Sequence, residues 1–94
     1  GNYALDANTT ASDNTAVGYA ALGANTTGSQ NTAVGLYALR QATTALFNTA
    51  VGYFSQDDTT TGGYNTSIGG YSAQQITTGH TNVAVGYAAA LVTI

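Results

Sequence analysis

Hydrophobic, small and polar positions recur along this chain with a period of 17 residues. Each repeat is numbered here from the asparagine that opens it, so that this asparagine is position one. Three columns run through the repeats: the asparagine column (Asn14, Asn31, Asn48, Asn65, Asn82), the valine column at position four (Val17, Val34, Val51, Ile68, Val85) and the glycine column at position five (Gly18, Gly35, Gly52, Gly69, Gly86). A fixed period in this range indicates a solenoid, in which each repeat is one turn stacked on the previous one.

Small and larger side chains alternate at positions two to four of each repeat, and this alternation predicts strands. Positions two and four share one face of a strand, and position three faces the other side. Position two is threonine until Val83 replaces it, which indicates that the face with positions two and four points inward. We therefore expect position three on the outside, where its small size would let another surface pack closely. Position eight is small as well: Ala4, Ala21, Ala38, Ser55, Ser72 and Ala89.

Helical alternatives fit poorly, because threonine, asparagine, glycine and β-branched residues disfavour helix and no repeat holds an amphipathic stretch of the usual length. We predict three short strands in each turn, near positions one to four, six to nine and twelve to fifteen. The expected fold is all-β: a parallel β-solenoid (β-roll or β-helix) of about five and a half turns, forming one domain over residues 1–94. Turns stacked at about 4.8 Å would let each asparagine bond to the asparagines above and below it.

The chain begins at position five of one repeat and stops at position thirteen of another. We therefore expect a section of a longer array. Charged residues make up only 5% of the sequence, and a single basic residue provides no electrostatic footprint for nucleic acid or anionic membrane. No apolar run is long enough for membrane insertion. Four charged residues fall at positions ten or eleven, which we interpret as a solvated corner: Asp6, Arg40, Asp57 and Asp58.

Candidate chemistry is sparse, so we expect no enzyme activity, catalytic residue, cofactor or metal. His80 is the only histidine and there is no cysteine to share a metal with it, so an exposed turn residue is the simpler interpretation. The adjacent carboxylates of Asp57 and Asp58 fit a solvated corner better than a cation site. No base stands out that would activate a serine or threonine. Glycosylation sequons at Asn8, Asn25 and Asn65 are attributed to chance in a threonine-rich repeat.

The stretch NTAVGYAALGANTTGSQNTAVGLYAL resembles the repeats of phage tail-fibre shafts that carry a C-terminal self-cleaving chaperone domain. It is also similar, more distantly, to the head repeats of trimeric autotransporter adhesins, most clearly at residues 82–86 (NVAVG). The adhesin resemblance implies a left-handed parallel β-roll, three of which pack around a threefold axis, although adhesin coils are shorter. Such a homotrimer would bury the small residues of position three or position eight against neighbouring chains.

These observations favour a non-enzymatic structural role, as an extracellular, cell-surface or virion fibre shaft or adhesin segment that serves attachment to a receptor or glycan. A subunit that assembles end to end into filaments is one alternative. Ice binding is another, although the threonines at positions thirteen and fourteen are adjacent and only Thr59 with Thr61 has the spacing of an ice-binding face. Aromatic residues at positions six and seven are expected to pack in the core or between chains. A carbohydrate-binding surface would instead use Tyr19, Tyr53 and Tyr87.

Overall fold

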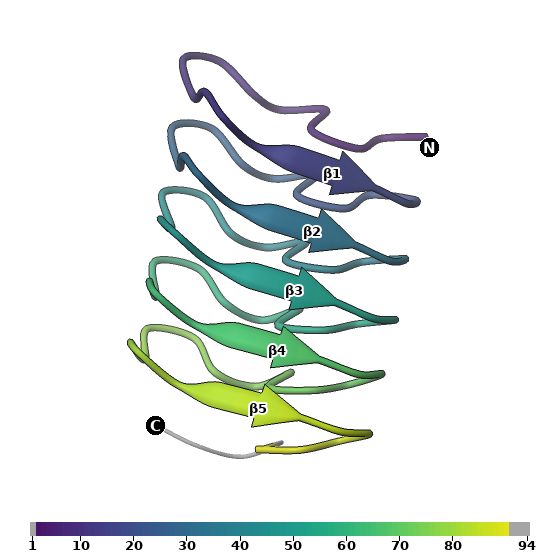
Figure 1. The fold of residues 1–94 in the computed structure, drawn as a ribbon. Coiled ribbons are helices and arrows are strands. Elements are labelled where there is room, and N and C mark those ends of the chain that lie inside the picture. Colours follow the sequence, from purple (N-terminus) through teal and green to yellow (C-terminus); the bar gives the residue numbers. More distant parts are fainter. Residues whose placement is uncertain (1, 91–94) are drawn as a thin grey trace.

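The computed structural model describes residues 2–90, which wind into a stack of turns with one short strand in each (Figure 1). The strands are β1 (Thr15–Val17), β2 (Thr32–Val34), β3 (Thr49–Val51), β4 (Thr66–Ile68) and β5 (Val83–Val85). They form one parallel sheet in the order β1-β2-β3-β4-β5, and the described residues contain no helix. The predicted all-β parallel solenoid is confirmed.

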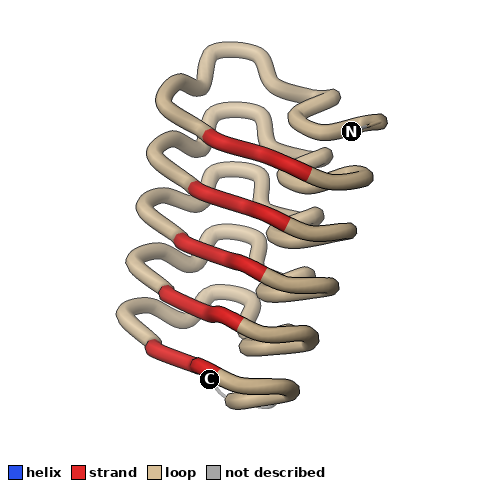
Figure 2. Tube along the Cα trace, turned by 45° about the vertical axis from the view of Figure 1, so that its right-hand side comes forward, coloured by secondary structure: helices blue, strands red, loops and turns tan. Residues whose placement is uncertain are grey.

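Residues 17 positions apart lie next to each other in this sheet. Val17 is paired with Val34, Val34 with Val51, and the same register continues to Val85. Figure 2 shows the five strands stacked along one side, with the loops of each turn behind them. The period read from the sequence is therefore the length of one turn.

The sheet faces the opposite way from the sequence-based prediction. The position-three side chains of Ala33, Ala50 and Ser67 are completely buried, whereas the valine column points outward, with Val17 54% and Val85 67% exposed. The small residues of position eight also lie inside the turn, where Ala21 and Ala38 are fully buried. The two walls of each turn meet through these columns, so their residues are small because the interior is thin.

Only one of the three strands predicted for each turn is present. The segments near positions six to nine and twelve to fifteen form turns and loops instead. They still bond to their neighbours along the stack: the N–H of Thr26 donates to the carbonyl of Thr43 at 3.0 Å, and that of Thr43 to Thr60 at 3.0 Å. The threonine segment thus forms interturn hydrogen bonds without the geometry of a strand.

Besides the glycine column, residues other than glycine adopt positive φ angles at the tight turns of each repeat. They occupy positions seven, nine and seventeen, as in Tyr37 (φ 62°), Leu39 (φ 50°) and Phe47 (φ 59°). Each of these three residues donates its backbone N–H to an adjacent turn, to the carbonyls of Tyr19, Ser55 and Ser29 respectively. A left-handed conformation costs an L-residue about 1–2 kcal/mol. The interturn hydrogen bonds offset part of that strain.

The interior changes character along the stack. Leu22 and Leu39 belong to one buried apolar cluster, and Ile76 to another. Between them lies a buried polar cluster, in which the hydroxyl groups of Ser55 and Ser67 are 2.6 Å apart. The Nε2 of Gln56 donates to the hydroxyl of Ser67 at 2.9 Å and to the carbonyl of Thr49 at 3.0 Å.

Candidate interaction surface

The asparagine column is part of the framework of the solenoid. The backbone N–H of Asn48 donates to Oδ1 of Asn31 at 2.9 Å, and that of Asn65 donates to Oδ1 of Asn48 at 3.0 Å. In the first four asparagines of the column, Nδ2 reaches across its own turn to a carbonyl 14 residues later, at 2.8 Å from Asn48 to Gly62. Asn31, Asn48 and Asn65 are buried. Their polar side-chain atoms bond to other residues of the chain, so these three asparagines offer no free groups to a ligand.

The outer face of the sheet is apolar along position four and carries hydroxyl groups along position two. Within residues 2–90, the side chains of Thr15, Thr32, Thr49 and Thr66 make no hydrogen bond, unlike those of Thr9, Thr26 and Thr60, which donate to carbonyls of the next turn. Large exposed apolar patches mark interaction surfaces in soluble proteins. The valine column is an apolar surface on the outer face, where Val17, Ile68 and Val85 are exposed and Val34 and Val51 are half-buried.

An aromatic row runs along the turn that follows the carboxyl ends of the strands. Its rings touch across neighbouring turns, with centroids 5.4 Å apart for Tyr3 and Tyr19, 5.8 Å for Tyr19 and Tyr37, and 5.5 Å for Tyr53 and Tyr71. Phe54 contacts both Tyr37 and Tyr53 and so connects the two groups of tyrosines, and Tyr71 contacts Tyr87 at 5.9 Å. The row comprises Tyr3, Tyr19, Tyr37, Tyr53, Phe54, Tyr71 and Tyr87.

The aromatic row lies on the exterior of the chain, so packing in the core is wrong, and packing between chains stays a prediction. The sequence-based candidates for glycan contact, Tyr19, Tyr53 and Tyr87, are 42%, 49% and 79% exposed. Desolvation raises the pKa of the Tyr71 phenol above its ordinary value, and the neighbouring Tyr53 and Tyr87 add to the increase. The rings therefore form one outward-facing surface, in which each aromatic side chain also supports its neighbours.

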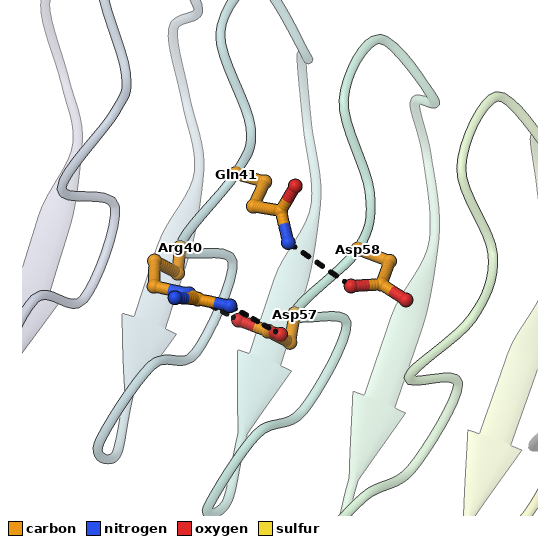
Figure 3. A network of polar contacts seen from close by, with 4 residues as sticks. All are labelled: Arg40, Gln41, Asp57 and Asp58. Carbon is orange, nitrogen blue, oxygen red and sulfur yellow. Dashed lines mark hydrogen bonds and ion pairs between the residues drawn. The ribbon is translucent and has the colours of Figure 1, made fainter.

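The charged corner is less solvated than the sequence indicates. Figure 3 shows Arg40 and Asp57 at matching places in adjacent turns, joined by two hydrogen bonds. The distances are 2.8 Å from Nε to Oδ1 and 3.0 Å from Nη2 to Oδ2, and the Asp57 side chain is only 3% exposed. The guanidinium carbon of Arg40 also lies 4.3 Å from the ring centroid of Tyr37.

Asp58 lies next to this ion pair and accepts a hydrogen bond from Nε2 of Gln41 at 3.1 Å (Figure 3). Desolvation, followed by the charge of Asp57, raises the pKa of the Asp58 carboxyl above its ordinary value. The hydrogen bond to Asp57 raises the pKa of the Arg40 guanidinium above its ordinary value, so the guanidinium stays charged. Stacked position-ten and position-eleven side chains thus bind each other across turns.

The remaining sequence candidates are dispersed. His80 is exposed, as expected, and its Nδ1 accepts a hydrogen bond from the N–H of Gly63 at 3.0 Å. Among the residues that the structure describes, no three metal-ligating side chains lie together and no pocket is present. The sequon residues Asn25 and Asn65 are buried, whereas Asn8 is exposed.

Two further observations bear on candidate functions raised by the sequence. Thr59 is buried and its hydroxyl donates to the carbonyl of Ile76 at 2.8 Å, whereas Thr61 is exposed. The one pair with ice-binding spacing therefore does not share an outer face. Within the described part of the chain, no helix is long and apolar enough to span a membrane.

The sequence did not lead us to predict an exposed aromatic pair at position seventeen, directly before the asparagine that opens the next turn. Phe47 and Tyr64 occupy position seventeen of successive turns, and their rings stack with centroids 5.0 Å apart and an angle of 10° between the planes. The sequence does contain a feature that could have revealed the pair, because position seventeen is polar in the other repeats, at Asp13, Gln30 and Thr81. An aromatic residue that interrupts a polar column is exposed unless something covers it.

Comparisons with protein-family models, with curated proteins and with solved structures find no match for this chain.

Proposed function

We propose that this chain is a non-enzymatic structural segment of an extracellular or virion fibre or adhesin, and that it associates with copies of itself as a homotrimer. The observation that supports the proposal is the outward valine column, which leaves apolar β-branched side chains exposed or half-buried along the outer face of the sheet. Burying each such side chain contributes about 1.5–3 kcal/mol. The resemblance to fibre-shaft and adhesin repeats supports the assignment to attachment.

The structure changes which surface would form the trimer. The position-three and position-eight columns fill the interior of each turn, so they are not free to contact another chain. The valine column, flanked by the aromatic row, is the surface that remains. A second copy suits it because it presents the same ladder with the same spacing, so contacts made at one turn repeat at every turn.

The mass of the assembly in native buffer tests this proposal, by light scattering coupled to size exclusion. The wild-type chain should have three times the mass of one chain, and Val51→Lys should lower the assembly mass because it places a charge in the contact surface. Gln75→Lys is the matched control, since Gln75 is exposed and lies away from the valine column. A stable wild-type monomer, or equal effects of the two lysines, would contradict the proposal. Long uniform fibres in electron micrographs would favour the end-to-end filament instead.

Carbohydrate binding is the second candidate, favoured by the exposure of Tyr19, Tyr53 and Tyr87. Tyrosines that present an apolar ring and a polar tip to solvent are typical of recognition surfaces. A glycan array probed with the wild-type chain tests it, followed by alanine substitution of the three tyrosines. Glycan binding that survives all three substitutions would exclude these side chains as the contact.

A further inference from the structure

The tyrosines of the aromatic row fall into two separate runs. In the first run Tyr19 contacts Tyr3 at 5.4 Å and Tyr37 at 5.8 Å between ring centroids. In the second run Tyr71 contacts Tyr53 at 5.5 Å and Tyr87 at 5.9 Å. Each of these contacts joins two neighbouring turns of the solenoid, and each run has one central tyrosine through which both of its contacts pass.

Phenylalanine separates the two runs. Tyr37 touches Phe54 at 5.0 Å, and Phe54 touches Tyr53 at 4.5 Å, so the contact between the runs passes through a ring that has no hydroxyl group. The remaining tyrosine, Tyr64, is 59% exposed and stacks on Phe47. The molecule therefore contains six tyrosines with tyrosine neighbours and one exposed tyrosine that packs only on phenylalanine.

We propose that the two tyrosine runs are sites of oxidative cross-linking, in which a one-electron oxidant such as a haem peroxidase with hydrogen peroxide joins adjacent turns through dityrosine bonds. Two phenols each lose one electron and one proton and become phenoxyl radicals. The radicals combine by forming one carbon–carbon bond between ring positions next to the oxygens, and the hydrogen on each of these carbons then moves to its oxygen. One hydrogen peroxide accepts the two electrons and two protons and becomes two molecules of water.

The contacts favour coupling within one chain. Four of the six tyrosines are exposed to the oxidant, and Tyr37 and Tyr71 are half-buried. The partner ring is already in contact, so coupling needs no encounter between two protein chains. The chain has no cysteine, so no disulfide can fasten one turn to the next. A dityrosine bond would serve as that fastening, closing a loop of similar length to those closed by stabilising disulfides.

The position of the single arginine makes the test sharp. Arg40 lies between the runs, and the sequence contains no other lysine or arginine, so trypsin divides the denatured chain into residues 1–40 and 41–94. Each tryptic peptide carries one complete run. After dilute wild-type protein is treated with peroxidase and hydrogen peroxide, each peptide should be lighter by two hydrogens, fluoresce as dityrosine and remain separate from the other peptide.

Three conservative variants complete the experiment, each of which keeps the aromatic ring. Tyr19→Phe should abolish the mass loss in residues 1–40 and leave 41–94 unaffected, and Tyr71→Phe should do the reverse. Tyr64→Phe should change neither. The cross-linked wild type should also unfold at a higher temperature than the untreated protein, by on the order of 10 °C.

Several results would overturn the proposal: unchanged peptide masses, tryptic peptides joined to each other, coupling found only between two chains, or a cross-link in residues 41–94 that is lost in Tyr64→Phe. Treatment in denaturant gives the reference for random coupling, in which cross-links should form between the two peptides as well. If the folded and denatured samples give the same pattern, the geometry of the row does not direct the reaction. The mass loss within one tryptic peptide is measured separately from the mass of the assembly, so failure of this proposal can be distinguished from failure of the trimer proposal.

Discussion

The glycine column tests most directly how closely the turns approach each other. Gly35 has φ +132°, and a Cβ placed on it would lie 2.6 Å from the carbonyl oxygen of Gly52 in the next turn. Gly86 has a similar φ of +125°, but a Cβ there would meet nothing nearer than the Ala89 Cβ at 3.9 Å. Both glycines therefore have a positive φ, but only Gly35 is also limited by the backbone of the next turn.

Alanine substitution separates these two constraints. Both Gly35→Ala and Gly86→Ala force an L-residue to a φ beyond +120°, a sparsely populated region, at a cost of about 1–3 kcal/mol. Only Gly35→Ala also pushes a methyl group into a rigid backbone, and overpacking of this kind costs about 1–3 kcal/mol more. The reduced flexibility of the unfolded chain is the same in both variants and cancels. We expect a loss of about 2–6 kcal/mol for Gly35→Ala and about 1–3 kcal/mol for Gly86→Ala.

Urea unfolding followed by circular dichroism measures both free energies, with the dependence on urea concentration checked for a common slope. Equal destabilisation by the two substitutions would refute the reasoning, because the approach of neighbouring turns would then contribute nothing at Gly35. A larger effect at Gly86 would refute it more strongly, since no backbone lies above that residue among those described.

Three further perturbations follow from hydrogen bonding, backbone strain and charge. Asn48→Ala should lower the free energy of unfolding by about 2–6 kcal/mol in urea titrations, because it leaves two buried backbone groups unpaired at about 1–3 kcal/mol each. Gln30→Asn should raise it by about 0.5–1 kcal/mol, since asparagine tolerates the positive φ of 58° better, whereas Gln75→Asn should have no effect. Because the pKa of Asp58 is raised in the folded state, the native protein binds the proton more tightly, and stability falls as pH rises through that pKa. Asp58→Asn should remove this fall in thermal unfolding measured between about pH 3 and pH 7. An unchanged dependence of stability on pH in the variant would contradict the prediction.

Much of the fold could be predicted because the repeat is strict. Asn14, Asn31 and Asn48 recur at one interval, and in a solenoid equal spacing means equal position, so the register of the whole sheet follows from counting. The inward face could not be read in the same way. In four of the five strands both faces carry an apolar residue, since alanine at position three alternates with valine at position four, and the choice of inward face depends on how thick the interior is. The opposite wall leaves room only for alanine or serine, which excludes Val34 and Val51 from the inside.

The turns and the polar contacts were harder to predict. Tyr37 and Leu39 adopt left-handed conformations that their residue types disfavour, because their backbone N–H groups bond to neighbouring turns. In the sequence Asp57 looks like a solvated charge, and only the stacking of successive turns places it against Arg40 of the preceding turn. The aromatic row was visible as a column of tyrosines, but its place on the exterior depends on the same orientation of the turn that was predicted wrongly.

The buried cluster of Ser55, Gln56 and Ser67 divides the hydrophobic interior into two separate parts. In a protein whose turns contact only their neighbours, cooperativity passes from turn to turn through shared burial. Hydroxyl and amide groups hydrated in the unfolded chain contribute little net stability there, and Gln56 Oε1 has no partner within the described residues. Under tension along its axis, the stack should part at this turn first, so that a fibre built from such segments yields by releasing one block at a time.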